Sequence, residues 1–315
     1  MEMQDAHEFI ILLLSWLHDD LNAVTTTGEL PPRPPAEGLP NIKAGEAAWC
    51  DFQRYNSSIV TQLFHGLHKS TLLCTGCGSE SVTFETFSLL SLPLAIGKSN
   101  LTQCLDEYVR GDLITDWTCP KCQCRCDVHK KLDLWWLPPI VILHLKRFSF
   151  AGGTARKNHA QVTFPLRDLD LSRLAVGSHP NTYRLVYDLY GVVEHHGSQD
   201  SGHYTAYSFN HPADSWFFMD DSKVRECSAA SVRDATAYLL CYRARERHAP
   251  EGVFTGDDGA KSTAPAHGEW RTALVGSSTI RAPPPSRWRG GTASSAATRF
   301  DSAATRTADL GHGGG

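Results

Sequence analysis

A histidine and a pair of aspartates have the residue types and the spacing needed for acid–base chemistry. His203 stands where a polar, glycine-containing loop gives way to an alternation of residues typical of a strand. A second strand-like stretch, Trp216 to Met219, follows a turn and ends at Asp220 and Asp221. A hairpin would bring these carboxylates beside the imidazole. A carboxylate on one ring nitrogen fixes the tautomer and stabilises the cation, as a general base for a thiol or hydroxyl nucleophile requires.

Four cysteines form two Cys-x-x-Cys pairs, the spacing of zinc knuckles. They are Cys74 with Cys77 and Cys119 with Cys122. Four thiolates complete a tetrahedral zinc site and leave no coordination position open, so we predict structural rather than catalytic zinc. Cys124 and Cys126 extend the second pair and leave the fourth ligand open. Reduced thiols without a metal are the alternative interpretation.

The composition restricts the expected cellular location and the classes of binding partner. Of 315 residues 41% are hydrophobic and 10% aromatic, which is enough for a buried core, and the net charge of -4 argues against a nucleic-acid partner. The apolar run from Phe9 to Leu14 is too short to span a bilayer, and the first residues lack the positive region of a secretory signal. We therefore expect no membrane partner, reduced thiols and a cytoplasmic location, with the nucleus as a second site.

The first predicted helix begins at an Asp-x-x-Glu capping box, Asp5 to Glu8, and runs to about Leu21. Apolar residues recur along it at three- and four-residue spacing, so we expect one buried face, formed by Phe9, Leu12, Leu13, Trp16 and Leu17.

Further elements follow from apolar patterning. The run from Ile140 to Phe148 predicts a central buried strand, in which His144 is interpreted as a core residue. Val82 to Leu94 predicts one strand that ends at a proline, and Ala237 to Tyr242 predicts the strand that closes the sheet. Leu101 to Arg110 predicts a helix with Thr102 as its cap.

Several of these motifs occur together and in one order: Gln-Asp-Ala-x-Glu-Phe around Asp5, the paired knuckles, Leu-Pro-Pro before Leu-His-Leu-Lys-Arg-Phe, Gly-His-Tyr around His203, and Trp-x-x-x-Asp-Asp. Together they resemble the ubiquitin-specific protease family of cysteine deubiquitinases, from Gln4 to Tyr242. The resemblance implies an α+β, papain-like cysteine protease core with a palm and zinc-ribbon fingers. It also implies cleavage of the isopeptide bond after the terminal glycine of ubiquitin.

The resemblance assigns roles residue by residue. His203 would act as base and then as acid, Asp220 would orient it, and Asp221 would support it. The implied partners are ubiquitin and ubiquitinated proteins, and the implied ubiquitin-binding residues are Asp5, Glu8, Gly202 and Tyr204. The implied cofactor is structural zinc on the four knuckle cysteines.

The family's nucleophile is a cysteine at a helix amino terminus, in a segment before the Gln-Asp-Ala motif. Because this sequence begins next to that motif, we expect that segment, part of the thumb, to be missing. Cys50 lies in a helical stretch with no local base, and Cys227 should point away from His203. Two functions stay open: a cysteine-type deubiquitinase domain truncated before its nucleophile and doubtful as an enzyme by itself, or a non-catalytic ubiquitin-binding or scaffold protein.

The domain organisation follows from a change in composition. Residues 1–246 are predicted to form a partial catalytic domain, with the fingers at about 70–130. Gly, Ala, Ser, Thr and Pro dominate residues 247–315, which cannot bury enough apolar surface to offset the entropy of ordering. We therefore expect a disordered tail there.

Overall fold

The protein is described from a computed structural model, which defines residues 5–24, 40–94, 99–151, 154–177, 185–198 and 201–245. All of them belong to one compact unit, Met1–Pro250. The predicted tail over 247–315 and Gln4 lie outside the described residues.

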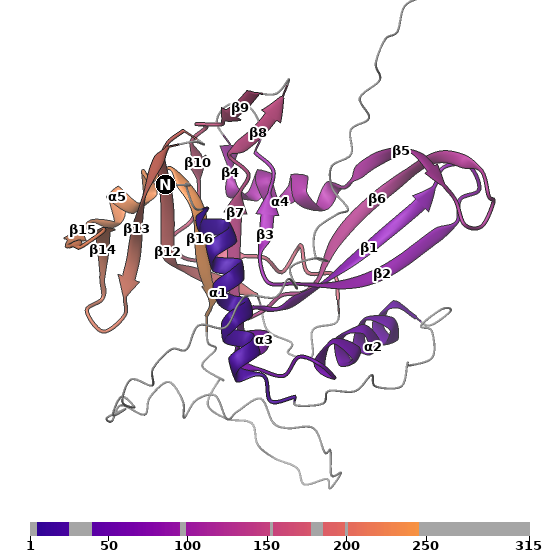
Figure 1. The fold of residues 1–315 in the computed structure, drawn as a ribbon, viewed down its shortest axis with the longest axis horizontal. Coiled ribbons are helices and arrows are strands. Elements are labelled where there is room, and N and C mark those ends of the chain that lie inside the picture. Colours follow the sequence, from indigo (N-terminus) through magenta and orange to yellow (C-terminus); the bar gives the residue numbers. More distant parts are fainter. Residues whose placement is uncertain are drawn as a thin grey trace, which may run out of the picture. The chain divides into compact units, whose positions relative to one another are not determined.

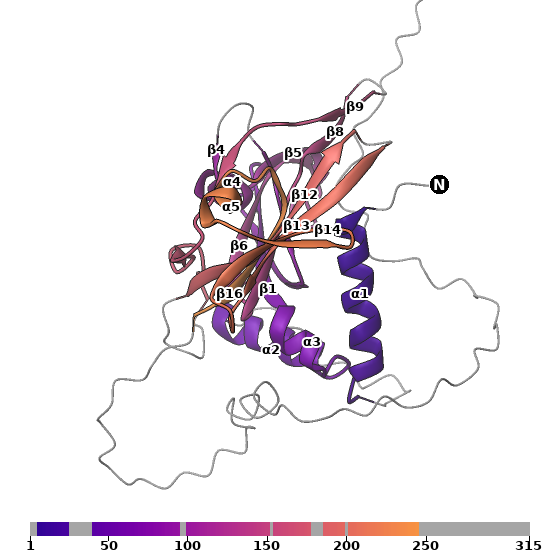
Figure 2. The same ribbon diagram turned by 90° about the vertical axis from the view of Figure 1, so that its left-hand side faces the viewer.

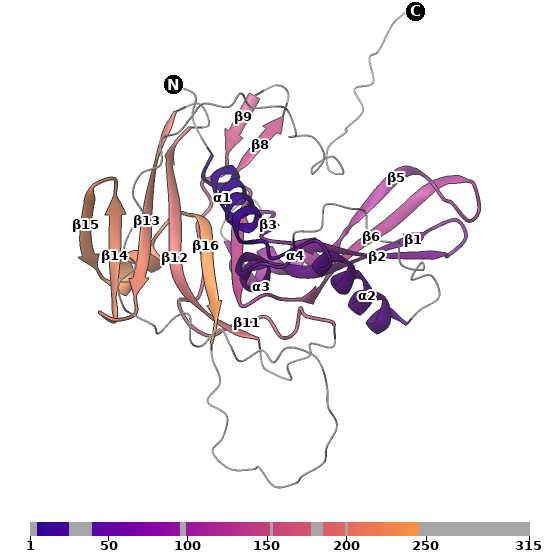
Figure 3. The same ribbon diagram turned by 60° about the horizontal axis from the view of Figure 1, so that its bottom comes forward.

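The main sheet carries the predicted acid–base residues. Its strands lie in the order β15-β14-β13-β12-β16-β7-β3, and β11 pairs with β12 (Figure 3). All neighbours are antiparallel except β3 and β7, which are parallel. The bounds are β3 Leu90–Leu92, β7 Ile140–Leu145, β11 Leu169–Asp170, β12 Val186–Gly197, β13 Gly202–Asn210, β14 Ser215–Asp220, β15 Lys223–Cys227 and β16 Ala237–Ala244.

The core lies around the centre of this sheet. Leu143 on β7 and Leu240 on β16 are fully buried, and Val192 on β12 is almost so. The prediction of a central buried strand at β7 is therefore confirmed. The prediction that Ala237 to Tyr242 closes the sheet is wrong, because β16 lies between β12 and β7. Its first six residues are buried on both faces, as expected for an interior strand.

A second, four-stranded sheet has the order β2-β1-β6-β5 and carries the cysteine pairs (Figure 1). Its strands are β1 Gly66–Cys74, β2 Glu80–Phe87, β5 Asp112–Thr118 and β6 Arg125–Trp136. We call it the finger sheet. The single strand predicted over Val82 to Leu94 is two strands, because the chain leaves the finger sheet after β2 and enters the main sheet at β3.

Five helices occur among the described residues: α1 Ala6–Leu21, α2 Asn41–Gln53, α3 Ile59–Phe64, α4 Leu101–Arg110 and α5 Ala229–Arg233. The predicted bounds of α4 are confirmed, but its cap is Asn100 rather than Thr102. Asn100 accepts from the amide of Gln103, whose side chain accepts from the amide of Asn100, which makes a complete capping box. None of the described helices is long and apolar enough to cross a membrane.

The predicted buried face of α1 is wrong. The helix packs onto Val60 and Ile142 through Leu14, with Ile10 beside it, and leaves the adjacent side of the helix exposed (Figure 2). We call this side the apolar row of α1; its members, Phe9, Leu12, Leu13, Trp16 and Leu17, are 36 to 59% exposed. Periodicity located the stripe but could not show whether anything covers it.

Two small strand pairs complete the fold. Strands β8 Phe148–Ala151 and β9 Thr154–Lys157 form a hairpin, and β4 Ser99–Asn100 pairs in parallel with β10 Val162–Thr163. The guanidinium of Arg147, which is 1% exposed, ties this region to the main sheet. It donates to the carbonyl oxygens of Ala237, Asn158 and Ala160 at 2.6, 3.0 and 2.9 Å.

Candidate active site and metal centre

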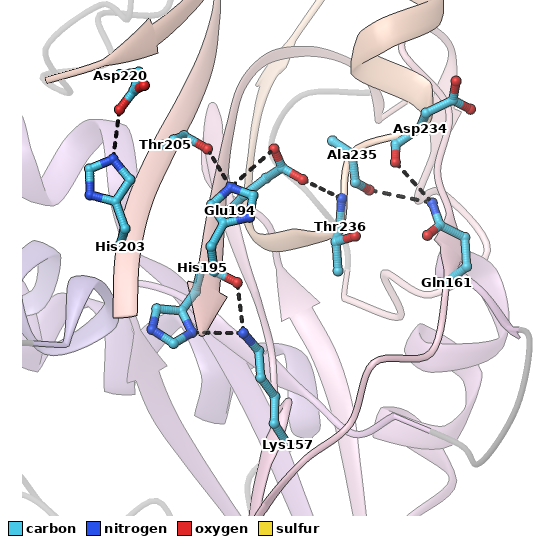
Figure 4. A network of polar contacts seen from close by, with 11 residues as sticks. Lys157, Gln161, Glu194, His195, His203, Thr205, Asp220, Asp234, Ala235 and Thr236 are labelled. Carbon is cyan, nitrogen blue, oxygen red and sulfur yellow. Dashed lines mark hydrogen bonds and ion pairs between the residues drawn. The ribbon is translucent and has the colours of Figure 1, made fainter. Parts of the chain in front are cut away.

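The predicted hairpin brings the imidazole and a carboxylate together. His203 is the second residue of β13, and Asp220 is the last residue of β14. Nε2 of His203 lies 2.6 Å from Oδ1 of Asp220 (Figure 4). Ala206 pairs with Met219, so continuing this register places Asp220 opposite Thr205 and on the same face as His203. The contact is thus a diagonal one between neighbouring strands.

The two groups stabilise each other's charged forms. The hydrogen bond with Asp220 raises the pKa of His203 above its usual value; burial opposes this rise, and the negative charge of Asp221 adds to it. The same hydrogen bond lowers the pKa of Asp220. Because Nε2–H donates to Asp220, the neutral ring has its unprotonated nitrogen at Nδ1. Nδ1 is therefore the atom that can accept a proton.

Asp221 begins the turn between β14 and β15, with a positive φ of 50°. Its carboxylate belongs to one cluster with His203 and Asp220, whose ring nitrogen and carboxylate oxygens lie within 4.8 Å of one another. Asp221 is exposed and acts on His203 through its charge.

A second layer of polar residues, which was not predicted from the sequence, lies beside the pair. His196 is opposite His203 in the sheet register, and its Nε2 is 2.8 Å from Oγ1 of Thr205. Glu194 is 6% exposed and lies 3.8 Å from Nε2 of His196, while its other oxygen accepts from the amide of Thr236 at 2.5 Å (Figure 4). The alternation of Glu194 and His196 along a strand was the one available signal, and it needs the cross-strand register to become meaningful.

Three of the four predicted ubiquitin-binding residues, Asp5, Glu8 and Tyr204, lie at the amino terminus of α1. Oδ1 of Asp5 caps α1 by accepting from the amides of His7 and Glu8, and Oδ2 accepts from the hydroxyl of Tyr238 at 2.7 Å. The hydroxyl of Tyr204 accepts from the amide of Ala6 at 3.3 Å. Glu8 and Gly202 are exposed. Asp5 and Tyr204 thus dock the helix on the sheet, while Glu8 and Gly202 are open to a ligand.

His144 is a core residue, as predicted. Its Nδ1 lies 3.0 Å from Oγ of Ser91, and its ring stacks on His7 with the centroids 4.0 Å apart. Burial lowers the pKa of His144 to about 3, so it remains neutral near pH 7.

The cysteine pairs converge at one end of the finger sheet. The four Sγ atoms of Cys74, Cys77, Cys119 and Cys122 lie within 4.8 Å of one another, and those of Cys77 and Cys119 are 3.8 Å apart. Four sulfurs bound to zinc at about 2.3 Å would be about 3.8 Å from each other. Backbone amides, first that of Cys122, lower the pKa of Cys119 to about 6, which favours the thiolate. The donor set and its spacing fit zinc.

The two further cysteines, Cys124 and Cys126, differ in their position relative to the cluster. Sγ of Cys126 lies 3.3 Å from Sγ of Cys74, so it is a fifth sulfur beside the cluster. Cys124 is exposed and its Sγ donates to the carbonyl oxygen of Cys122. The four predicted cysteines are thus the ones whose sulfurs converge, with Cys126 next to them.

No cysteine among the described residues is in hydrogen-bond contact with His203. Cys227 pairs with Trp216, whereas Asp220 pairs with Lys223. Four residues of strand, about 13 Å, separate the two positions. Burial also raises the pKa of Cys227, which makes it a poor nucleophile. Cys50 lies exposed on α2.

Comparison with known proteins places this arrangement in a family. The model of the family described as ubiquitin carboxyl-terminal hydrolase matches residues 1–242. The chain belongs to the ubiquitin carboxyl-terminal hydrolase family. Ubiquitin carboxyl-terminal hydrolase 2 of Homo sapiens is 38% identical over 246 residues, which cover 76% of this chain and 40% of that protein. Ubiquitin carboxyl-terminal hydrolase 2 of Gallus gallus is 38% identical over 248 residues, which cover 76% of this chain and 68% of that protein.

Solved structures agree with the family. The SAGA DUB module with Ubp8 bound to monoubiquitin has a TM-score of 0.60 and 29% identity, covering 78% of this chain and 50% of that chain. A yeast SAGA DUB module has a TM-score of 0.61 at 29% identity, with 78% and 52% covered. The papain-like α+β fold expected from the sequence is therefore confirmed. This hydrolase-family chain spans about half the length of these structural neighbours.

Proposed function

We propose that this chain is a cysteine-type deubiquitinase domain that acts on the isopeptide bond after the carboxyl-terminal glycine of ubiquitin. The observation that carries the proposal is the 2.6 Å contact between His203 and Asp220, which leaves Nδ1 of the imidazole as a proton acceptor. Ubiquitin is the proposed partner because the family is one of ubiquitin hydrolases and a solved neighbour is a complex with monoubiquitin.

In the proposed reaction a cysteine thiol loses its proton to Nδ1 of His203, and the thiolate attacks the carbonyl carbon of the terminal glycine. Asp220 stabilises the resulting imidazolium. His203 then gives the proton to the departing lysine amine, which leaves ubiquitin as a thioester on the cysteine. A water molecule, deprotonated by His203, hydrolyses the thioester and returns the thiol. Asp221 supports the imidazolium by its charge.

The thiol must come from sequence other than the described residues, because none of their cysteines contacts His203. The same observation favours a second candidate function, a ubiquitin-binding or scaffold protein that performs no chemistry. In both cases Glu8 and Asp5 would attract the cationic carboxyl-terminal stretch of ubiquitin. Zinc on the four knuckle cysteines would stabilise the finger sheet. Because zinc binds reduced cysteines, we also propose that the protein acts in the cytoplasm or nucleus, where thiols stay reduced.

The test uses ubiquitin that carries a fluorogenic amine on its terminal carboxyl. We would measure binding of ubiquitin to this chain, and hydrolysis by this chain fused to the nucleophile segment of the family. The proposal expects binding by both proteins and hydrolysis by the fusion, with a loss of roughly a millionfold in turnover for His203→Ala. Binding without hydrolysis by the fusion would establish the scaffold function, and absence of ubiquitin binding would contradict both.

A further inference from the structure

Lys157, the last residue of β9, connects the β8–β9 hairpin to the main sheet close to His203. Its Nζ lies 2.9 Å from Nδ1 and 2.7 Å from the carbonyl oxygen of His195 (Figure 4). It also lies 2.8 Å from the carbonyl oxygen of Gly197. An ammonium group has three N–H donors, one for each of these acceptors. All three acceptors are therefore paired when Lys157 is charged and Nδ1 of His195 carries no proton, while Nε2 of His195 is buried without a hydrogen-bond partner.

The ring of His195 is enclosed. His195 is 3% exposed and packs against Tyr204 and Phe148, with ring centroids 4.8 and 5.3 Å away. The ring of Phe148 also lies 5.6 Å from the Lys157 ammonium. Burial lowers the pKa of His195, and the positive charge of Lys157 lowers it further. These contacts keep His195 neutral, and with Nδ1 occupied by Lys157 its proton is on Nε2.

This ring forms the support under the residue that precedes His203. A Cβ added to Gly202 would lie 2.1 Å from Nε2 of His195 and 2.6 Å from the carbonyl oxygen of His196. On the partner strand Gly197 has a φ of 105°, and a Cβ there would lie 2.4 Å from the carbonyl oxygen of Ser201. The end of the β12–β13 hairpin is thus made of two glycines in close contact, and glycines give a backbone much conformational freedom. Ser198 donates its amide to the carbonyl oxygen of Ser201 within this end, and a contact from outside the hairpin would restrict its freedom further.

We propose that Lys157 is a positioning residue for His203. By binding the ring and backbone of His195 and the backbone of Gly197, it fixes the end of β12, against which Gly202 and His203 are held by strand pairing. The hydrogen bonds of Lys157 go to His195 and Gly197 and not to His203 or Asp220, so it acts through His195 and Gly197. Only the effect on ubiquitin turnover depends on the proposed function; the ordering of the hairpin end is a property of the chain itself.

The test compares Lys157→Met, which keeps the apolar stem and removes the three donors, with Lys43→Met, which removes an exposed lysine on α2. Amide hydrogen exchange is followed by NMR in the whole chain. We expect exchange at the end of the β12–β13 hairpin to rise roughly tenfold or more in Lys157→Met, equivalent to about 1.4 kcal/mol, while β7 and β16 stay unchanged. The ring 15N signals of His195 should also shift, because Nδ1 loses its donor, and its pKa should rise. Lys43→Met should change none of these signals.

Unchanged exchange at the hairpin end would overturn the proposal, and so would a uniform rise that includes β7 and β16, since this would show a general loss of stability. If Lys157→Met does not fold, Lys157→Gln is judged by the same criteria. The fusion used for the proposed function gives the consequence for turnover: kcat should fall for Lys157→Met and not for Lys43→Met. If wild-type protein binds no ubiquitin, the proposed function fails while the exchange result still decides the role of Lys157.

Discussion

Nε2 of His203 and Oδ1 of Asp220 lie 2.6 Å apart although the two residues are not directly opposite each other on their strands. Asp220 continues the register opposite Thr205, two residues along β13 from His203. The start of β13 therefore provides the imidazole, and the last position of β14 provides the carboxylate on the same face of the sheet. Each group biases the protonation of the other, which gives two measurable consequences.

The first prediction concerns the pKa of His203. Asp220→Asn should lower it, because the hydrogen bond to the carboxylate is the main cause of its elevation. Asp221→Asn should lower it less, since Asp221 acts only by charge. NMR titration of the His203 ring protons measures both values. Equal effects of the two variants, or no effect of Asp220→Asn, would contradict the geometry.

The second prediction is the pH range in which the pair stabilises the fold. A raised pKa of His203 gives stability that is lost as pH rises through that pKa, and a lowered pKa of Asp220 gives stability that is lost as pH falls through it. The contribution should be complete between the ordinary pKa values of 3.8 and 6.5. Urea unfolding of wild type and Asp220→Asn should therefore differ more at about pH 5 than at about pH 9. A larger stability difference at the higher pH would contradict this prediction.

The third prediction concerns the metal. Purified protein should contain one zinc per chain, and Cys119→Ser should lose most of it, because the site needs four thiolates. Cys124→Ser should keep its zinc, since Sγ of Cys124 bonds to a carbonyl oxygen. Metal analysis and exchange in the finger sheet measure the outcome. Because structural zinc contributes about 10 kcal/mol or more to folding in small domains, chelation should destabilise the finger sheet first. Retention of zinc by Cys119→Ser would point to Cys126 as a replacement ligand.

The fourth prediction uses glycine substitution beside His203. Gly202→Ala should cost about 1 to 3 kcal/mol, because its Cβ would overlap a ring held by Lys157 and a carbonyl oxygen. Gly191→Ala is the matched control on β12, where the nearest atom to an added Cβ is 3.4 Å away. Chemical denaturation compares the two. Similar costs for both variants would show that the approach of His195 to Gly202 is unimportant.

The fifth prediction separates the two sides of α1. Leu14→Ala should destabilise the fold by about 2 to 5 kcal/mol, because Leu14 is buried. Trp16→Ser should change stability by less than about 1 kcal/mol, because Trp16 is 59% exposed. Urea unfolding measures both, and light scattering should show less self-association in Trp16→Ser. A large loss of stability in Trp16→Ser would mean that the apolar row is covered in solution.

The sequence predicted the local features of this fold, namely a helix cap, a hairpin and a cysteine cluster. Asp5 caps α1, the hairpin between β13 and β14 forms, and the four knuckle cysteines converge, because each depends on residues close together in the chain or on a fixed ligand chemistry. The role of Asp220 as the partner of His203 followed from the same hairpin.

The errors arose where packing between distant segments decides the outcome. The periodicity of α1 does not show which side of the helix contacts Val60. The apolar sequence of β16 does not show whether the strand lies at the edge or in the centre of the sheet. Glu194, His196 and Lys157 were missed because their meaning depends on cross-strand register and on a hairpin that returns from elsewhere. Sequence spacing carries no information on such contacts.

The side-chain alternation of β13 and β14 limits how this part of the gene can change in length. One codon inserted within either strand between His203 and Asp220 would turn one of the two side chains to the other side of the sheet, although both residues would still be encoded. Insertions in the turn formed by 211–214 would leave the alternation intact. Length variation among natural variants should therefore gather in that turn.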